Sequence, residues 1–137
     1  MTNETPEAGE ITEQVLAALD PDVAEVVRGY LEDPIASVDL LEDRVALYAK
    51  ELESRAEEGG VFDLDQALTL TRQCEALLSV AEELAEEPRR LVQAATLYLC
   101  VADDADGDME SLIGFDDDAA LIETVAIAIG RADLLDE

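Results

Sequence analysis

Apolar residues recur at intervals of three and four over long parts of this 137-residue chain, which is the spacing of one face of an α-helix. Between about residues 34 and 58 they form a narrow row of Val38, Leu41, Val45, Tyr48 and Leu52. A second row follows between residues 64 and 86, formed by Ala67, Leu70, Cys74, Leu77, Ala81 and Leu84. Two long amphipathic helices joined by a short glycine-containing loop predict an antiparallel helical hairpin.

Proline and glycine stand where these helical segments are expected to begin and end. Asp20–Pro21 and Asp33–Pro34 each read as an N-cap residue followed by proline at the first helical position. Gly59–Gly60 is a stop signal for the first long helix. Asp63 with Gln66 then predicts a capping box at the start of the second.

The remaining segments also favour helices. A first helix is expected over residues 11–19, and Glu87–Pro88 is expected to open a helix that is apolar almost all round and runs to about Ala102. A last helix should be capped by Asp116 or Asp117 and end near Gly130. The predicted fold is an all-α bundle of about five to six helices with a buried C-terminal helical hairpin, in a single domain over residues 10–137 after a flexible leader at 1–9.

The charge of the chain restricts its partners. Thirty-five acidic residues against eight basic ones give a net charge of −27, and Lys50 is the only lysine. Such acidity with so little lysine is typical of proteins from cells that accumulate salt, because molar salt screens the repulsion between carboxylates. Nucleic acid is not an expected partner, since no basic face is available to neutralise phosphates. An anionic membrane surface would repel the chain for the same reason.

The chain is expected to be soluble and cytoplasmic. Its first ten residues are polar and acidic, unlike a signal peptide. The longest apolar runs, residues 91–102 and 119–129, are well short of the ~20 residues that span a membrane. Cys74 and Cys100 both lie on apolar helical faces and are expected to be reduced, packed thiols.

The side-chain inventory argues against catalysis and against a resident cofactor. Without histidine, neither a Ser-His-Asp nor a Cys-His device can be built. Two separated cysteines cannot complete a zinc site. No Lys-Ser/Thr follows Gly59–Gly60, so there is no phosphate-binding loop. Carboxylates, or less plausibly Tyr48, Tyr98 or Lys50, would have to do any acid–base chemistry.

The segment DDADGDME, residues 103–110, offers several carboxylates to a hard cation such as calcium or magnesium. An EF-hand loop does not fit. With Gly107 at the sixth loop position, Ala102 would occupy the first position and Ile113 the twelfth, where acidic ligands are needed. A less formal metal site could still use Asp104, Asp108, Asp117 and Asp118.

The alternative gives these acids structural tasks. Asp108 would cap a one-turn helix, Asp116 or Asp117 would cap the last helix, and the other acids would belong to the solvated coat. The segment then serves as a hinge between two buried helices.

Residues 98–122, YLCVADDADGDMESLIGFDDDAALI, resemble the signature of the YkvA-like family, a small helical domain of unknown function, here of the acidic haloarchaeal type. The family pattern has an aromatic-apolar helix end, then sPiDliPD, then lGylDDaavl. Aligned without a gap, it matches Tyr98, Asp104, Asp108, Gly114, Phe115, Asp117, Asp118, Ala119 and Ala120.

The family's three prolines fall on Ala102, Gly107 and Ser111, so the resemblance implies a looser turn here than in the family. It implies a helical hairpin at the C-terminus and no reaction.

Interaction with protein is the function that these observations favour. Spare apolar positions, such as Leu40, Leu47, Leu64 and Leu68, widen the stripes of the two long helices beyond one seam. They predict a groove for an unknown protein partner, or a homodimer face. A divalent-cation-binding domain is the alternative.

Overall fold

The computed structural model describes residues 10–59, 64–102 and 116–135, and these form helices and connecting turns with no β-strand among them. The all-α prediction is confirmed. The described α-helices are α1 (Glu10–Ala17), α2 (Pro21–Leu31), α3 (Val38–Glu57), α4 (Leu64–Ala81), α5 (Glu86–Leu97) and α7 (Asp116–Ala128). A π-helix, η1 (Tyr98–Ala102), extends α5, and a 3-10 helix, η3 (Ala132–Leu135), follows α7.

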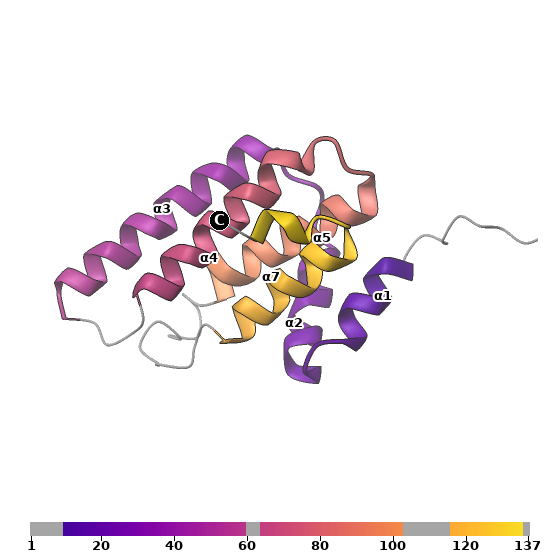
Figure 1. Cartoon of the computed structure of the whole chain (residues 1–137), viewed down its shortest axis with the longest axis horizontal. Coiled ribbons are helices and arrows are strands. Elements are labelled where there is room, and N and C mark those ends of the chain that lie inside the picture. The colour runs from indigo at the N-terminus through magenta and orange to yellow at the C-terminus, as the bar shows by residue number, and fades with distance from the viewer. Residues whose placement is uncertain (1–9, 60–63, 103–115, 136–137) are drawn as a thin grey trace, which may run out of the picture.

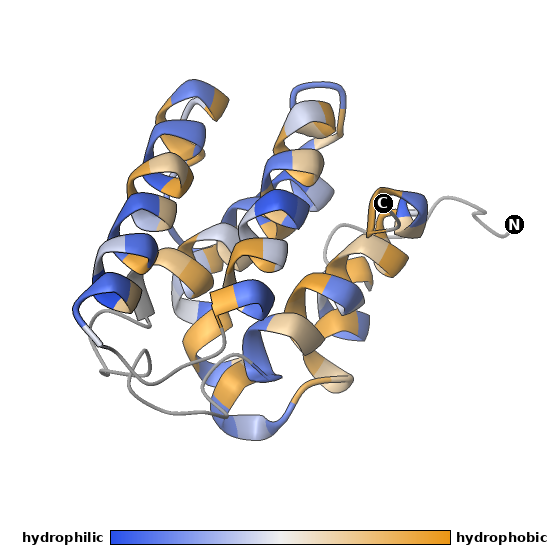
Figure 2. Ribbon diagram, turned by 60° about the vertical axis from the view of Figure 1, so that its left-hand side comes forward, coloured by the Kyte–Doolittle hydropathy of each residue, from blue (hydrophilic) through white to orange (hydrophobic). Residues whose placement is uncertain are grey.

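The two long helices α3 and α4 lie side by side as the predicted hairpin, with α3 along one edge of the molecule (Figure 1). All five residues of the predicted row on α3 are buried, as are the residues of the second row that fall within α4. Leu84 is half-buried and lies beyond the end of α4. Hydrophobic and hydrophilic residues alternate along these ribbons (Figure 2), as amphipathic helices require.

Helix α5 is the centre of the bundle. Its residues from Leu91 to Thr96 are all buried, and it contacts α1, α2, α3, α4 and α7. This burial against several neighbours agrees with the prediction that the segment is apolar almost all round. The hydrophobic core draws on all six described α-helices. Among the described residues, no helix is long and apolar enough to cross a membrane.

The predicted start of α2 is confirmed and that of α3 is wrong. Pro21 occupies the first turn of α2, with Asp20 at the N-cap position. Helix α3, however, begins at Val38, and its N-cap is Ser37, whose Oγ accepts a hydrogen bond from Leu40 N at 3.1 Å. The Asp33–Pro34 signal therefore does not open a helix.

Side chains from α5 explain why residues 33–36 stay outside α3. The Gln93 Nε2 donates to Pro34 O at 2.9 Å, and its Oε1 accepts from Ala36 N at 2.8 Å. Arg90 Nη1 donates to Asp33 O at 2.7 Å and to Leu31 O at 3.1 Å. These backbone groups are satisfied by tertiary hydrogen bonds, which compete with a helical turn.

The two ends of the α4–α5 connection also differ from the sequence-based bounds. Helix α4 ends at Ala81 instead of residue 86, and the chain turns through hydrogen bonds from Glu83 N to Val80 O and from Leu84 N to Ala81 O. Helix α5 begins at Glu86, so Pro88 lies in its first turn. Backbone N–H groups in the first turn have no acceptor within the helix, so a proline there costs no hydrogen bond.

Glycine terminates two helices, as expected. Gly59 after α3 has a φ of 96° and Gly130 after α7 has a φ of 78°, a region that residues with a side chain rarely adopt. Gly60 and the predicted capping residue Asp63 lie outside the described residues.

Candidate functional site

The four predicted metal ligands fall in two groups. Asp104 and Asp108 lie outside the described residues, together with the rest of the acidic segment. Asp117 and Asp118 lie in the first turn of α7. Because α7 begins at Asp116, both Asp116 and Asp117 lie in its first turn and neither is its N-cap. In the first turn their carboxylates still complement the positive end of the helix.

Asp117 and Asp118 have different surroundings. Asp117 is exposed, whereas Asp118 is 1% exposed and both of its carboxylate oxygens are buried. Consecutive residues of an α-helix point about 100° apart, so these carboxylates diverge. Within the described ranges, no three Cys, Asp or Glu side chains are grouped so that they could hold a metal ion. A cation site that includes Asp104 and Asp108 stays a prediction.

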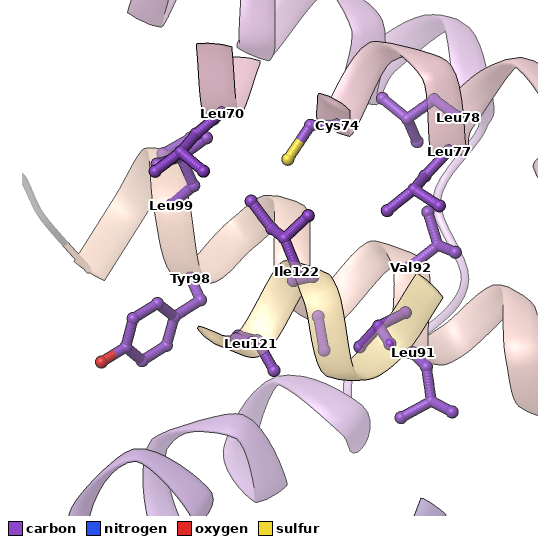
Figure 3. Close-up of a cluster of buried hydrophobic side chains, with 14 of the residues drawn as sticks. Leu70, Cys74, Leu77, Leu78, Leu91, Val92, Tyr98, Leu99, Leu121 and Ile122 are labelled. Atoms are coloured by element: carbon purple, nitrogen blue, oxygen red, sulfur yellow. The ribbon is translucent and has the colours of Figure 1, made fainter. Parts of the chain in front are cut away.

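The buried thiol of Cys74 interacts electrostatically with Asp118 inside the core. Both cysteines are free and buried, which confirms their prediction as packed thiols. Burial raises the pKa of the Cys74 thiol well above its ordinary value, and electrostatic interactions with Cys100 and Asp118 raise it further, although a hydrogen bond with Thr96 acts in the opposite direction. Cys74 of α4 points toward Ile122 of α7 in this cluster (Figure 3). The protonated thiol is therefore the stable form at neutral pH.

A solvent-open hollow of about 580 Å³ lies between α4, α7 and η3. Its lining is rich in oxygen atoms and has two carboxylates, but no basic side chain; the residues are Asp65, Gln66, Thr69, Leu70, Gln73, Ala119, Glu123 and Leu135.

Two large apolar side chains are exposed on the outer face of α3. Among the described residues, no other helix carries two such side chains. Leu40 is 63% exposed and Leu47 is 59% exposed. They are seven residues apart, so they lie on one stripe of the helix. Asp43, Arg44, Lys50 and Glu51 flank this stripe and are all exposed. We call these six residues the α3 outer face.

A second hollow, of about 280 Å³, adjoins the α3 outer face where α3 meets α5 and the α2–α3 connection. Leu40 and Arg44 line it together with Leu41 and Leu97, and Pro34 and Gln93 close its other side. The α3 outer face therefore continues into a mostly apolar depression.

The predicted interaction surface is only partly exposed. Leu40 and Leu47 are exposed as predicted, but Leu64 and Leu68 on α4 are half-buried and pack against the core. The charged residues of the α3 outer face were not predicted as functional. Their spacing of seven, the same as that of the two leucines, is the signal that marks them in the sequence.

Comparisons with protein-family models, curated proteins and solved structures give no match. The resemblance to the YkvA-like family therefore stays a prediction. Of the positions that carry it, Tyr98 is buried, Asp117 is exposed and Asp118 is buried. The positions between residues 103 and 115 lie outside the described residues.

Proposed function

We propose that this chain is a non-catalytic helical domain of a salt-adapted cytoplasm that acts by binding another protein chain through the α3 outer face. The observation that carries the proposal is the pairing of Leu40 and Leu47, each about three-fifths exposed, on one stripe beside an apolar depression. Single exposed apolar residues are ordinary, but aligned ones beside a hollow are typical of interaction sites.

Other exposed apolar residues in the described part of the chain support this choice of face. Val26 on α2 is 41% exposed and Ile127 on α7 is 59% exposed, but each is the only such residue on its helix. The position of α3 at the edge of the bundle leaves its outer face open to a partner (Figure 1).

The chemistry of the chain supports the non-catalytic part of the proposal. There is no histidine to act as a base near neutral pH. Cys74 is a poor nucleophile because burial raises its thiol pKa, and only the thiolate is reactive. The argument for binding therefore rests on surface shape and charge.

Photo-cross-linking in concentrated extract of the source cells tests the proposal. A benzophenone amino acid replaces Leu40 in one variant and Ile127 in a control variant of similar exposure. We expect protein adducts from position 40 and none, or far fewer, from position 127. Equal adducts from both positions, or none from position 40, would contradict an interaction through the α3 outer face.

A further inference from the structure

The charges on the α3 outer face alternate in sign at the same spacing as the leucines. Asp43 and Lys50 are seven residues apart on one side of the leucine stripe, and Arg44 and Glu51 are seven apart on the other side. Residues seven apart differ by only about 20° around an α-helix, so each pair forms a row parallel to the helix axis. Each row therefore presents one acid and one base.

None of these four charged side chains takes part in an ion pair within the described part of the protein. The ion pairs there join Arg28 to Glu13, Arg90 to Glu86 and Arg131 to Asp133. In a chain with only eight basic residues, Arg44 and Lys50 have no carboxylate within 4 Å among the described residues. Arg44 and Lys50 lie beside exposed leucines and are therefore available to pair with carboxylates of a partner.

We propose that the partner is a second copy of this chain, bound by an antiparallel contact between the α3 outer faces about a twofold axis at Leu47. This inference rests on the proposed function, because it names the occupant of the same face. Such an axis reverses the second helix but keeps each charged row on its own side. With a rise of 1.5 Å per residue, Asp43 then lies within about 1.5 Å, measured along the axis, of Lys50 of the second copy, and Arg44 equally near its Glu51.

The same operation makes the apolar contacts. Leu47 meets Leu47 of the second copy at the centre. Leu40 meets Ser54 of the second copy, an exposed small side chain that leaves room for a leucine. A parallel pairing in register would exchange the sides of the two rows and place Asp43 beside Arg44 and Lys50 beside Glu51 of the second copy. The exchange of Asp43 with Lys50 in a double variant distinguishes the two arrangements, because it restores opposite charges only in the antiparallel one.

Salt sets the conditions for this contact. Each copy carries a net charge of −27, so two copies repel one another at long range in dilute buffer. At about 1 M salt the Debye length falls to ~3 Å, which removes most of this repulsion while groups in contact still interact. One helix face buries little surface, so the dimer belongs to the small, reversible class of interfaces.

Sedimentation equilibrium of the purified full chain in molar KCl tests the inference with charge-reversal variants. We expect Asp43→Lys and Lys50→Asp each to weaken the dimer about five- to tenfold, since each change puts like charges together twice. The double variant should restore the affinity of the wild type. This rescue cannot arise within one copy, because residues 43 and 50 are about 10.5 Å apart along the helix.

The two single variants separate specific pairing from net charge. Asp43→Lys makes the chain less acidic and Lys50→Asp makes it more acidic, so a net-charge effect would strengthen association in the first and weaken it in the second. Leu47→Ala should also weaken the dimer, whereas Ile127→Ala should leave it unchanged. Circular dichroism of each variant verifies that the exposed substitutions leave the fold intact.

The outcomes also separate this inference from the proposed function. A wild-type monomer at all concentrations, or a double variant that fails to recover, would overturn the second copy as partner. If position 40 still cross-links to a different protein, the α3 outer face keeps its proposed function with another occupant. If neither association nor cross-linking occurs, both proposals fail.

Discussion

The backbone amide of Ala36 donates a 2.8 Å hydrogen bond to the side-chain oxygen of Gln93, which lies 57 residues later and is 3% exposed. The Nε2 of the same Gln93 side chain donates to Pro34 O at 2.9 Å. Gln93 thus holds the backbone on both sides of Ile35 and fixes the connection between α2 and α3 against α5.

We expect Gln93→Leu to lower the free energy of unfolding by about 2–6 kcal/mol, since two backbone groups lose their partner at about 1–3 kcal/mol each. Urea unfolding followed by circular dichroism measures the loss.

Gln93→Glu is a sharper variant. Its carboxylate can accept from Ala36 N but cannot donate to Pro34 O, so its destabilisation should be relieved at acidic pH, where the protonated acid can donate. A loss that is equal at pH 7 and pH 4.5 would contradict this assignment.

The start of α3 provides a second test, because sequence and structure name different caps. Ser37→Ala should cost about 1 kcal/mol through loss of the hydrogen bond from Leu40 N. Asp33→Ala should cost little, since the interaction of Asp33 with Arg90 uses its backbone carbonyl. Thermal or urea unfolding of both variants decides between them. A larger loss for Asp33→Ala than for Ser37→Ala would restore the sequence-based cap.

This difference shows where prediction from sequence stops. The apolar rows of α3 and α4 could be predicted because a helix repeats its buried face at a fixed interval. The start of α3 could not, because Asp33–Pro34 has the local chemistry of a cap and the competing hydrogen bonds come from Arg90 and Gln93, more than 50 residues away. The Glu87 carboxylate on α5 accepts a hydrogen bond from Thr12 N in the first turn of α1 at 2.8 Å. This hydrogen bond could not be predicted from the sequence for the same reason.

The candidate surface was predictable in part. Spare apolar positions could be recognised on α3 and α4, but their exposure depends on which neighbours cover them. Leu64 and Leu68 are partly covered by the bundle, whereas Leu40 and Leu47 are exposed on the edge helix. Asp118 is buried and Asp117 is exposed because of the way α7 is rotated against the core. This rotation could not be predicted, because the sequence of α7 has little amphipathic pattern.

Two isoleucines of α7 compare buried and exposed positions on one helix. Ile122 is 1% exposed and points toward Cys74 (Figure 3), whereas Ile127 is 59% exposed. We expect Ile122→Ala to cost about 2–5 kcal/mol, from lost burial and the cavity left behind. Ile127→Ala should stay within about 0.5 kcal/mol of wild type. Urea unfolding at low protein concentration measures both; similar losses would contradict the placement of α7.

The Cys74 thiol predicts a pH dependence of stability. Its pKa is raised above 9.0 in the folded protein by burial, so above about pH 9 the folded state retains a proton that the unfolded state releases. Stability from this group is therefore present below about pH 9 and is lost as pH rises further. In Cys74→Ala, the fall of unfolding free energy between pH 8.5 and 10.5 should be shallower than in wild type. Parallel slopes would show that Cys74 ionises normally in the folded state.

The acidic surface predicts dependence on salt. Few of the 35 acids have a basic neighbour in the described structure, so repulsion between carboxylates should oppose folding when salt is removed. We expect helical circular dichroism to decline on dialysis from molar KCl, with a melting temperature lower by at least several degrees, since about 1 kcal/mol corresponds to roughly 4 °C in a chain of this size. Sucrose at matched osmolality, which does not screen charge, should not replace the salt. Unchanged melting would count against a salt-adapted protein.

The central position of α5 bears on how the chain folds as it is synthesised. Helices α1 to α4 leave the ribosome before α5, yet each of them buries part of its apolar face on that later helix. They must wait with these faces uncovered until about residue 97 has emerged, and the last contacts of α5 wait for α7. In a salt-rich cytoplasm the repulsion between neighbouring nascent chains is screened, so the acids of the first four helices keep the incomplete fold soluble through their hydration instead.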